Sequence, residues 1–436
     1  MLNYQFSKFV KETLLSSINN LELRKDQFVR DAAKDFTRNR SLPFGKMIKT
    51  ILSFGGGSLS TELTDLFYED QIFVSNSAFV QRRHKILPQA FSTLFKEFTF
   101  AFDDYKLFNG YRVLAVDGTD LHIPHNPKET DSYFQSLPNT KGFNLMHINA
   151  MYDLINKVYL DLCNQPGREK YEQKALVDMT DESTLLGKVL LIADRGYESY
   201  NVFAHLINKD WKFLIRVKDT KSKSILSSFD LPPSGEFDVN IHRILTRKRP
   251  KLVKTQPHIY KMLSNDSTFD YVDEEHPYYP MSLRTLRVQL DDGSYQCFIT
   301  NLDSDEFSSN TIKDLYYMRW GIETSFNSLK NVLGLTHLHS KKAESIVQEV
   351  YAKVIMFNFC SIITSHVMIK EKRKKHVHQH NFSVAIKICR DFFSKNNASI
   401  DIEALIQKFT LPIRKGRSSP RKVKQRTFVS FNNRLS

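Results

Sequence analysis

The chain has 436 residues, 41% of them hydrophobic and 25% charged, an ordinary balance for a folded, water-soluble protein with more than one domain. Its start lacks a cationic segment leading into an apolar run, and its four cysteines are widely separated, which argues against a signal peptide, a disulfide scaffold and a zinc ribbon. Residues 331–436 carry 20 Lys and Arg against 6 Asp and Glu, so the whole net charge of +14 lies there and indicates a polyanion partner or, alternatively, a solubilising tail.

Residues 1–105 have the apolar spacing of helices. Ser58, after Gly55–Gly57, is a predicted helix N-cap. A second segment, Ala78–Leu87, follows Ser75–Ser77 and carries four basic side chains: Arg82, Arg83, His84 and Lys85. Two short helices with a basic second helix are typical of a helix-turn-helix DNA reader, although cationic short helices are common in any protein.

Residues 106–218 alternate between apolar strands and amphipathic helices, which predicts an α/β sheet. The expected strands are Val113–Val116, His147–Met151, Val158–Leu162, Val189–Ala193 and Phe213–Val217. The expected helices are Arg168–Met179 and Tyr200–Asn208.

Residues 219–297 predict a mostly β insertion, because Phe237, Val239 and Ile241 alternate with polar neighbours and Asp291–Ser294 is a hairpin turn signal. Phe298–Asn301 is expected to rejoin the sheet, with helices from Ser309 onward. The apolar stretch Val354–Ile369 is short for a membrane span and contains polar residues, so we expect a buried helix and no membrane crossing.

Two acidic residues directly follow predicted buried strands, Asp117 after Val113–Val116 and Asp194 after Val189–Ala193. Ligands bind at the carboxyl ends of strands in such sheets. Together with Glu323 they would form an all-oxygen site suited to Mg²⁺ or Mn²⁺, and a pair of such ions supports displacement at phosphorus. The alternative is that each Asp is a turn former or helix cap, the role we assign to Asp120 and Glu198.

The segment Tyr316–Lys330 predicts an amphipathic helix that places Tyr316, Arg319, Glu323 and Lys330 on one face. One carboxylate flanked by phosphate-binding groups suits an enzyme acting on a phosphodiester. A solvated face with surface ion pairs is the alternative.

The C-terminal quarter has two cationic clusters, Lys370–Lys375 and Arg414–Arg426. The first is followed by His376, His378 and His380, which would form either a metal site or a solvated linker.

Taken together, Asp117-Gly118-Thr119, Asp194-Arg195-Gly196-Tyr197 and the spacing of Tyr316, Arg319, Glu323 and Lys330 resemble bacterial insertion-sequence DDE transposases with the YREK signature, the IS-four group. The resemblance implies an RNase H-like catalytic core interrupted by a mostly β insertion, with helical N-terminal and C-terminal regions. The implied domains are a helical DNA-end-binding domain (1–105), the core (106–218 and 298–369), the insertion (219–297) and a basic C-terminal region (370–436).

The resemblance also implies roles for residues. Asp117, Asp194 and Glu323 would be the catalytic triad holding two Mg²⁺ or Mn²⁺ ions. Tyr316, Arg319 and Lys330 would grip DNA phosphates, and Trp320 would either contact a displaced base or pack within the helix.

The implied function is cut-and-paste transposition at terminal inverted repeats of double-stranded DNA, by hydrolysis and then strand transfer into target DNA. The protein would be a homodimer in its synaptic complex, located in the bacterial cytoplasm at the nucleoid. No nucleotide cofactor is expected, because transesterification conserves phosphodiester energy and no GxxxxGK[ST] loop is present. The tail is more basic than the family requires, which favours a DNA role for it. Two alternatives are a non-catalytic or repurposed DNA-binding relative and a nuclease without strand transfer.

Overall fold

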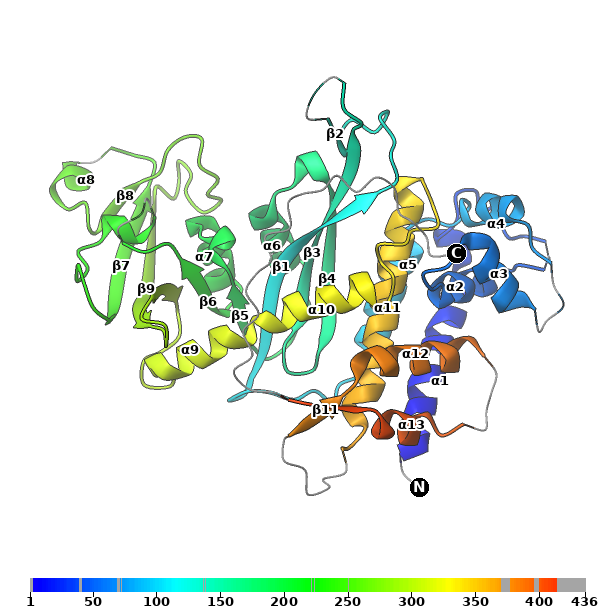
Figure 1. Ribbon diagram of the computed structural model, residues 1–436. Coiled ribbons are helices and arrows are strands. Elements are labelled where there is room, and N and C mark those ends of the chain that lie inside the picture. Colours follow the sequence, from blue (N-terminus) through cyan, green and yellow to red (C-terminus); the bar gives the residue numbers. More distant parts are fainter. Residues whose placement is uncertain are drawn as a thin grey trace.

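The computed structural model describes residues 3–38, 41–68, 71, 73–135, 137, 139–220, 222, 224–249, 251–369, 377–395 and 400–413. Within these residues, helices gather at one end of the molecule, a large sheet crosses its centre, and β7, β8 and α8 lie at the opposite end (Figure 1). The expected α/β class is confirmed.

Helices precede the sheet, as the apolar spacing predicts: α1 (Asn3–Leu23), α2 (Phe44–Ser53), α3 (Leu59–Phe67), α4 (Asn76–Arg83) and α5 (Gln89–Thr99). Ser58 caps α3 by accepting a hydrogen bond from the backbone N–H of Thr61, and Ser75 caps α4 in the same way. Both caps satisfy N–H groups that have no partner inside the helix.

Three of the four basic side chains in the segment Ala78–Leu87 contact protein groups, and one of them, Arg83 of α4, is buried. Arg83 forms an ion pair of 2.7 Å with Glu349, and their side chains are 3% and 1% exposed. Lys85 pairs with Asp35 at 2.6 Å, and Arg82 lies over the ring of Phe36. Buried Arg83 is therefore unavailable to DNA, and the helix-turn-helix interpretation of this segment stays a prediction that rests on its other basic side chains.

The sheet has the strand order β2-β3-β1-β5-β6-β10-β9-β7-β8, with β4 paired to β3. Its strands are β1 (Tyr111–Ile123), β2 (Tyr133–Phe134), β3 (Phe143–Asp153), β4 (Val158–Pro166), β5 (Lys188–Ala193), β6 (Lys212–Val217), β7 (Phe237–Thr246), β8 (Tyr260–Met262), β9 (Tyr278–Gln289) and β10 (Tyr295–Thr300). Strands β1, β5 and β6 are parallel neighbours. Strand β3 is antiparallel to β1, and β4 is antiparallel to β3.

Helices cover both faces of the sheet. One face carries α6 (Glu172–Asp181) and α7 (Tyr200–Asn208), and the other carries α9 (Ser309–Met318), α10 (Trp320–Asn331) and α11 (Ala343–His366). In β1, Leu114 and Val116 pack with the α6 side, whereas Val113 and Ala115 pack with the α11 side. Burial on both faces explains why the central strands are continuous apolar runs.

The residues expected to form a β insertion continue the same sheet, because β10 pairs with β6 and β9 and β7 follow. The predicted turn at Asp291–Ser294 joins β9 to β10. The short helix α8 (Lys251–Thr255) lies between β7 and β8.

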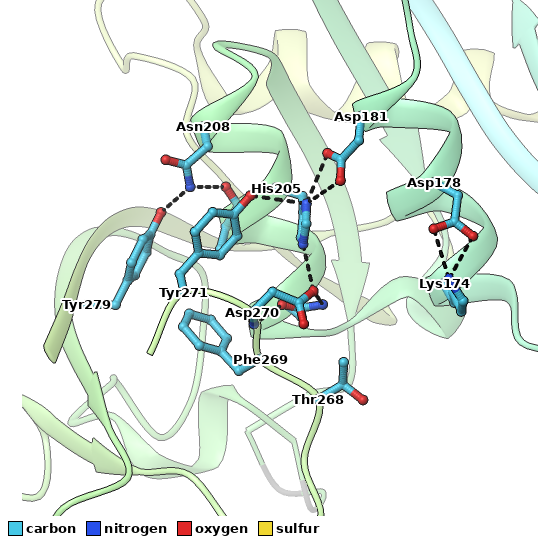
Figure 2. A network of polar contacts seen from close by, with 12 residues as sticks. Lys174, Asp178, Asp181, His205, Asn208, Thr268, Phe269, Asp270, Tyr271 and Tyr279 are labelled. Carbon is cyan, nitrogen blue, oxygen red and sulfur yellow. Dashed lines mark hydrogen bonds and ion pairs between the residues drawn. The ribbon is translucent and has the colours of Figure 1, made fainter. Parts of the chain in front are cut away.

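Polar contacts also tie this region to the helices of the core (Figure 2). Buried His205 of α7 lies between Asp181 of α6, at 3.0 Å, and Asp270, at 2.8 Å. Asn208 of α7 donates to the hydroxyl of Tyr279 on β9 at 2.8 Å. The segment that contains Asp270 is therefore fixed against α6 and α7.

Helix α11 is the central helix of the all-helical end. It contacts α1, α2, α5, α10, α12 (Phe382–Ser394), α13 (Ile402–Lys408) and β4. It is long and apolar enough to cross a membrane, but 83% of its apolar window is buried inside the protein, in line with the expected buried helix. A two-stranded antiparallel sheet of β11 (His378–His380) and β12 (Thr410–Pro412), which flank α12 and α13 in the chain, completes this end.

Candidate active site

Asp117 lies inside β1 and not after its end, which corrects the expected strand end at Val116. Pairing with antiparallel β3 continues to Ile123, whereas pairing with parallel β5 stops at Ala115 and Ile192. The strand is therefore held on one side only beyond Ala115. Asp117 and Asp194 lie just past the point where this pairing ends, at the carboxyl ends of two neighbouring parallel strands; we call this position the crevice.

Asp194 directly follows β5, as predicted, and caps the short 3-10 helix η3 (Arg195–Tyr197). Its Oδ1 accepts a hydrogen bond of 2.8 Å from the backbone N–H of Gly196. Continuing the register of Ala115 and Ile192 by two residues places Asp194 beside Asp117. Asp194 thus has a capping role as well as a position in the crevice.

The predicted helix Tyr316–Lys330 is two helices, because Arg319 separates α9 from α10. The junction has tight bonds of the 3-10 type, from Arg319 N–H to Tyr316 C=O and from Ile322 N–H to Arg319 C=O. The chain keeps nearly the same direction, as Figure 1 shows. Arg319 and Glu323 therefore remain one helical turn apart.

Arg319 links two of the predicted catalytic carboxylates. Its Nη2 lies 2.6 Å from Glu323 Oε1, and its Nη1 lies 3.5 Å from Asp117 Oδ2. The Arg319 side chain is 11% exposed, so this is a partly buried cluster and not the solvated ion-pair face of the alternative interpretation. A single guanidinium thus balances carboxylates from β1 and α10.

The electrostatic surroundings of Asp117 differ from those of a surface carboxyl. Burial raises its pKa to about 6, and the charges of Asp194 and Glu323 add to this effect. The backbone N–H of Gly118 and the Arg319 guanidinium act in the opposite direction. Asp117 is therefore close enough to Asp194 and Glu323 to be repelled by both, and a cation at this point would relieve that repulsion.

Lys330 lies further along α10 and also contacts β1. Its Nζ donates to Thr119 Oγ1 at 2.6 Å and to the Asp120 carbonyl at 2.8 Å. Side chains alternate along a strand, so Asp117 and Thr119 share the face that α10 covers. The sequence Asp117-Gly118-Thr119 thus presents two side chains to Arg319 and Lys330.

Tyr316 and Trp320 lie differently from one another. Tyr316 is 8% exposed, and its ring packs on Phe298 with centroids 4.8 Å apart. Its buried hydroxyl has no hydrogen-bond partner in the part of the chain that the structure describes. Trp320 is 55% exposed, so packing within the helix does not account for it and its side chain is accessible to a partner.

A polar cluster that the sequence reasoning missed lies on the other face of β1. Buried His147 of β3 is 2.6 Å from Asp120 and 3.2 Å from Glu172 at the start of α6. A Cβ on Gly118 would lie 2.4 Å from His147 Nε2, so this glycine allows close contact beneath Asp117. Asp120 is therefore an ion-pair partner and not a turn former. The only signal for Glu172 was its place in the helix that precedes β5.

Glu198 has a structural role, in agreement with its exclusion from the site. Its carboxylate accepts hydrogen bonds from the backbone N–H groups of Lys218, at 3.0 Å, and Ile225, at 2.7 Å.

The site has oxygen donors of the kind that bind a divalent ion, but the three carboxylates are too far apart in this structure to share one. Three carboxylates supply oxygen ligands of the kind that Mg²⁺ and Mn²⁺ prefer. In the described residues, no three His, Cys, Asp or Glu side chains are close enough together to hold an ion. Arg319 lies between two of the acids, so it would have to move before they could share a cation.

The predicted histidine cluster is only partly among the described residues. His380 Nε2 lies 2.7 Å from the carbonyl of Val367, and His378 lies in β11. His376 and both cationic clusters, Lys370–Lys375 and Arg414–Arg426, lie outside the described residues.

Comparison with known proteins assigns the family. Residues 108–359, more than half of the chain, match the family described as "Transposase DDE domain". The chain belongs to this family. The match contains Asp117, Asp194 and Glu323, as well as the region from β7 to β10. Insertion-sequence DDE transposase, the family expected from the motifs, is therefore confirmed.

Named relatives of this DDE transposase include the "Transposase for insertion sequence element IS231C" of Bacillus thuringiensis subsp. berliner. It is 28% identical over 139 residues, which are 30% of this chain and 28% of the relative. The "Putative transposase InsL for insertion sequence element IS186A" of Escherichia coli (strain K12) is 32% identical over 66 residues, 15% of this chain and 18% of the relative. Both matches span less than a third of the relative's own length.

Among solved structures, the "piggyBac transposase synaptic complex with hairpin DNA" is similar with a TM-score of 0.46 and 11% identity. The similarity covers 98% of this chain and 88% of that chain. A score this low supports no argument about function.

Proposed function

We propose that this DDE transposase cuts and joins DNA at the terminal inverted repeats of its own insertion sequence. The observation that carries the proposal is the convergence of Asp117, Asp194 and Glu323 at one crevice, with Arg319 between two of them. The strand order β4-β3-β1-β5-β6, with β1, β5 and β6 parallel, supports the RNase H-like core that the proposal requires.

Each side chain has a role that its position supports. Asp117, Asp194 and Glu323 would hold two Mg²⁺ or Mn²⁺ ions, which supply Lewis-acid stabilisation of the attacking and leaving oxygens when bound. Arg319 would leave its carboxylate partners and bind a phosphate of the DNA end, for which its planar fork is well suited. Lys330 of α10 contacts β1 at Thr119, two residues beyond Asp117, where a neighbouring phosphate would replace its bond to Thr119.

Tyr316 and Trp320 would complete the DNA contact. The unpartnered Tyr316 hydroxyl needs a hydrogen-bond acceptor, and a phosphate oxygen brought in by the DNA would provide one. Exposed Trp320, adjacent to Arg319, offers a flat surface for a base. The reaction would be hydrolysis to free a 3′ hydroxyl and then attack by that hydroxyl on target DNA.

The larger assembly follows from the same proposal. The protein would act as a homodimer in the bacterial cytoplasm, at the nucleoid, with double-stranded DNA as substrate and no nucleotide cofactor. The helices of residues 1–105 would recognise the element end through side chains other than buried Arg83 of α4.

The test is a strand-cleavage and strand-transfer assay on duplexes that carry the element's own inverted repeats. The wild type should cleave with Mg²⁺ or Mn²⁺, and Asp194→Asn should reduce cleavage at least about 100-fold, since a ligand for catalysis is lost. Asp178→Asn is the matched control, because Asp178 lies on α6 in an exposed ion pair with Lys174. Equal cleavage by wild type and Asp194→Asn would refute the assignment.

The same assay separates the alternatives. Specific DNA binding without cleavage by any divalent ion would identify a non-catalytic DNA-binding relative. Nicked products that never join to target DNA would identify a nuclease.

A further inference from the structure

The region between β7 and β9 contains a long stretch without acidic residues. No Asp or Glu occurs between Asp238 and Asp266, whereas 7 Lys and Arg do. The near-neutral charge of the first 330 residues hides this local excess. A stretch of this kind either builds structure or presents positive charge to a partner.

Two of the arginines build structure. Arg243 is fully buried and donates to the carbonyls of Pro257 and His258, each at 2.8 Å. Arg247 donates to the carbonyls of Ser264 and Ser267. These bonds hold the loops on either side of β8, so neither guanidinium is available to a partner.

Four other cations follow directly and are exposed; we call them the insertion-tip patch. They are Lys248, Arg249, Lys251 and Lys254. None of the four forms an ion pair with a carboxylate in the part of the chain that the structure describes. Four lysines elsewhere on the surface have acidic partners: Lys8 with Glu12, Lys34 with Asp31, Lys174 with Asp178 and Lys313 with Asp291.

The patch has a fixed position relative to the crevice. It lies at the end of the molecule that carries α8 and β8 (Figure 1), and the sheet connects it to β5 by continuous pairing. Arg284 of β9 also binds Asp238 of β7 through two short bonds of 2.7 and 2.6 Å. The contacts of His205 and Asn208 (Figure 2) hold the neighbouring loop and β9 to the core helices.

The strand order gives a scale for this separation. Four strand-to-strand steps lead from β5 to β7. At about 4.8 Å for each step, the lateral distance is roughly 19 Å. Duplex DNA rises about 3.4 Å per base pair, so this distance corresponds to roughly six base pairs.

We propose that the insertion-tip patch binds the phosphate backbone of duplex DNA at least roughly six base pairs from the phosphate that is cut. The inference rests on the proposed function for the location of that phosphate in the crevice. Four flexible cations without acidic partners match a polyanion, and they offer no groups arranged to read bases. The contact is therefore independent of sequence and anchors the duplex that leaves the active site.

The test compares two variants of the full chain whose net charge is lowered by the same four units. The patch variant is Lys248→Ala, Arg249→Ala, Lys251→Ala and Lys254→Ala. The control variant is Lys174→Glu and Lys313→Glu, at lysines that already have acidic partners and lie outside residues 1–105. Circular dichroism verifies that both variants fold.

Fluorescence anisotropy with a 40-base-pair duplex of random sequence then gives Kd between about 50 and 200 mM KCl, without divalent ions. Each lost phosphate contact flattens the plot of log K against log salt by about 0.9, so the patch variant should flatten it by up to about 3.6. Over this fourfold salt range, the wild type would lose roughly 100-fold more affinity than the patch variant. The control variant should keep the slope of the wild type.

The outcomes separate this inference from the proposed function. If the patch variant has the slope of the control variant, the patch does not bind DNA. If the control variant flattens the slope as much as the patch variant, total charge is responsible and the inference fails. A wild type that never cleaves inverted-repeat DNA, but whose steep salt slope is lost in the patch variant, refutes the proposed function and supports the patch.

Discussion

Arg319 takes the place of a metal cation between Asp117 and Glu323. Its replacement should therefore affect metal affinity and DNA cleavage in opposite directions. Replacing Arg319 with methionine should tighten the binding of Mn²⁺ to the DNA-free protein and abolish DNA cleavage. A charge-assisted hydrogen bond such as the 2.6 Å contact to Glu323 contributes about 1.5–3 kcal/mol. The Arg319–Glu323 contact must break before an ion can bind Glu323. Removing the guanidinium should therefore improve the ion affinity roughly 10- to 150-fold.

Isothermal titration calorimetry with Mn²⁺, in the absence of DNA, measures the first effect directly. Cleavage of inverted-repeat DNA measures the second, which reflects the loss of a phosphate contact. Arg319→Lys is the matched control, because it keeps the positive charge but not the planar pair of donors. It should bind Mn²⁺ within about threefold of the wild type, since one charge-assisted contact remains.

A methionine variant that binds Mn²⁺ no more tightly than the wild type would refute this reasoning. The guanidinium would then be compatible with a bound ion, and the carboxylates would not need to release it.

Three further predictions concern stability and geometry. Arg83→Met should lower the free energy of unfolding in urea by about 3–5 kcal/mol, because it leaves Glu349 buried without its cation, and adding Glu349→Gln should recover part of that loss. Burial lowers the pKa of Lys353 from 10.5 to about 7. The unfolded chain therefore binds more protons between these values, and the stability of the wild type relative to Lys353→Met should rise from pH 7 to pH 10; a flat difference would contradict this. Gly118→Ala should reduce cleavage at least about tenfold and destabilise the fold by about 1–3 kcal/mol, because its Cβ would meet His147; unchanged thermal unfolding would show that the ring can move away.

The parts of the fold that the sequence predicts well are those governed by burial on both faces. Helix α7 begins and ends where its pattern predicts, and β5 starts one residue before the expected Val189. Such strands are continuous apolar runs, so each strand ends where the apolar residues end and its position can be predicted from the sequence. The positions of Asp117 and Asp194 beside each other follow from the same two strands.

Other features depend on partners that are distant in sequence. Residues 117–120 are small or polar residues of the kinds common in turns, but pairing with β3 keeps them in the strand. The cations of α4 look like a DNA-binding face, and only the fold brings Glu349 to Arg83. No local pattern shows that His147 and Glu172 meet beneath Gly118, because they come from β3 and α6.

The break at Arg319 has a different origin. The amphipathic pattern continues smoothly from Tyr316 to Lys330, and the helix direction hardly changes. The break consists of one turn with tighter backbone bonds, which side-chain periodicity does not report.

The burial of α11 has a consequence for fragments of this protein. The family match ends at Phe359, inside this helix, whose sides pack against α1, α2 and α5 as well as α12 and α13. A polypeptide cut at residue 359 would split the helix, and one that started at residue 108 would expose its apolar side to water. Expression of the isolated catalytic segment should therefore give aggregated material. A copy of the gene that is frameshifted before α11 would produce N-terminal helices without their packing partner, and such a product would be degraded instead of competing with the intact protein for element ends.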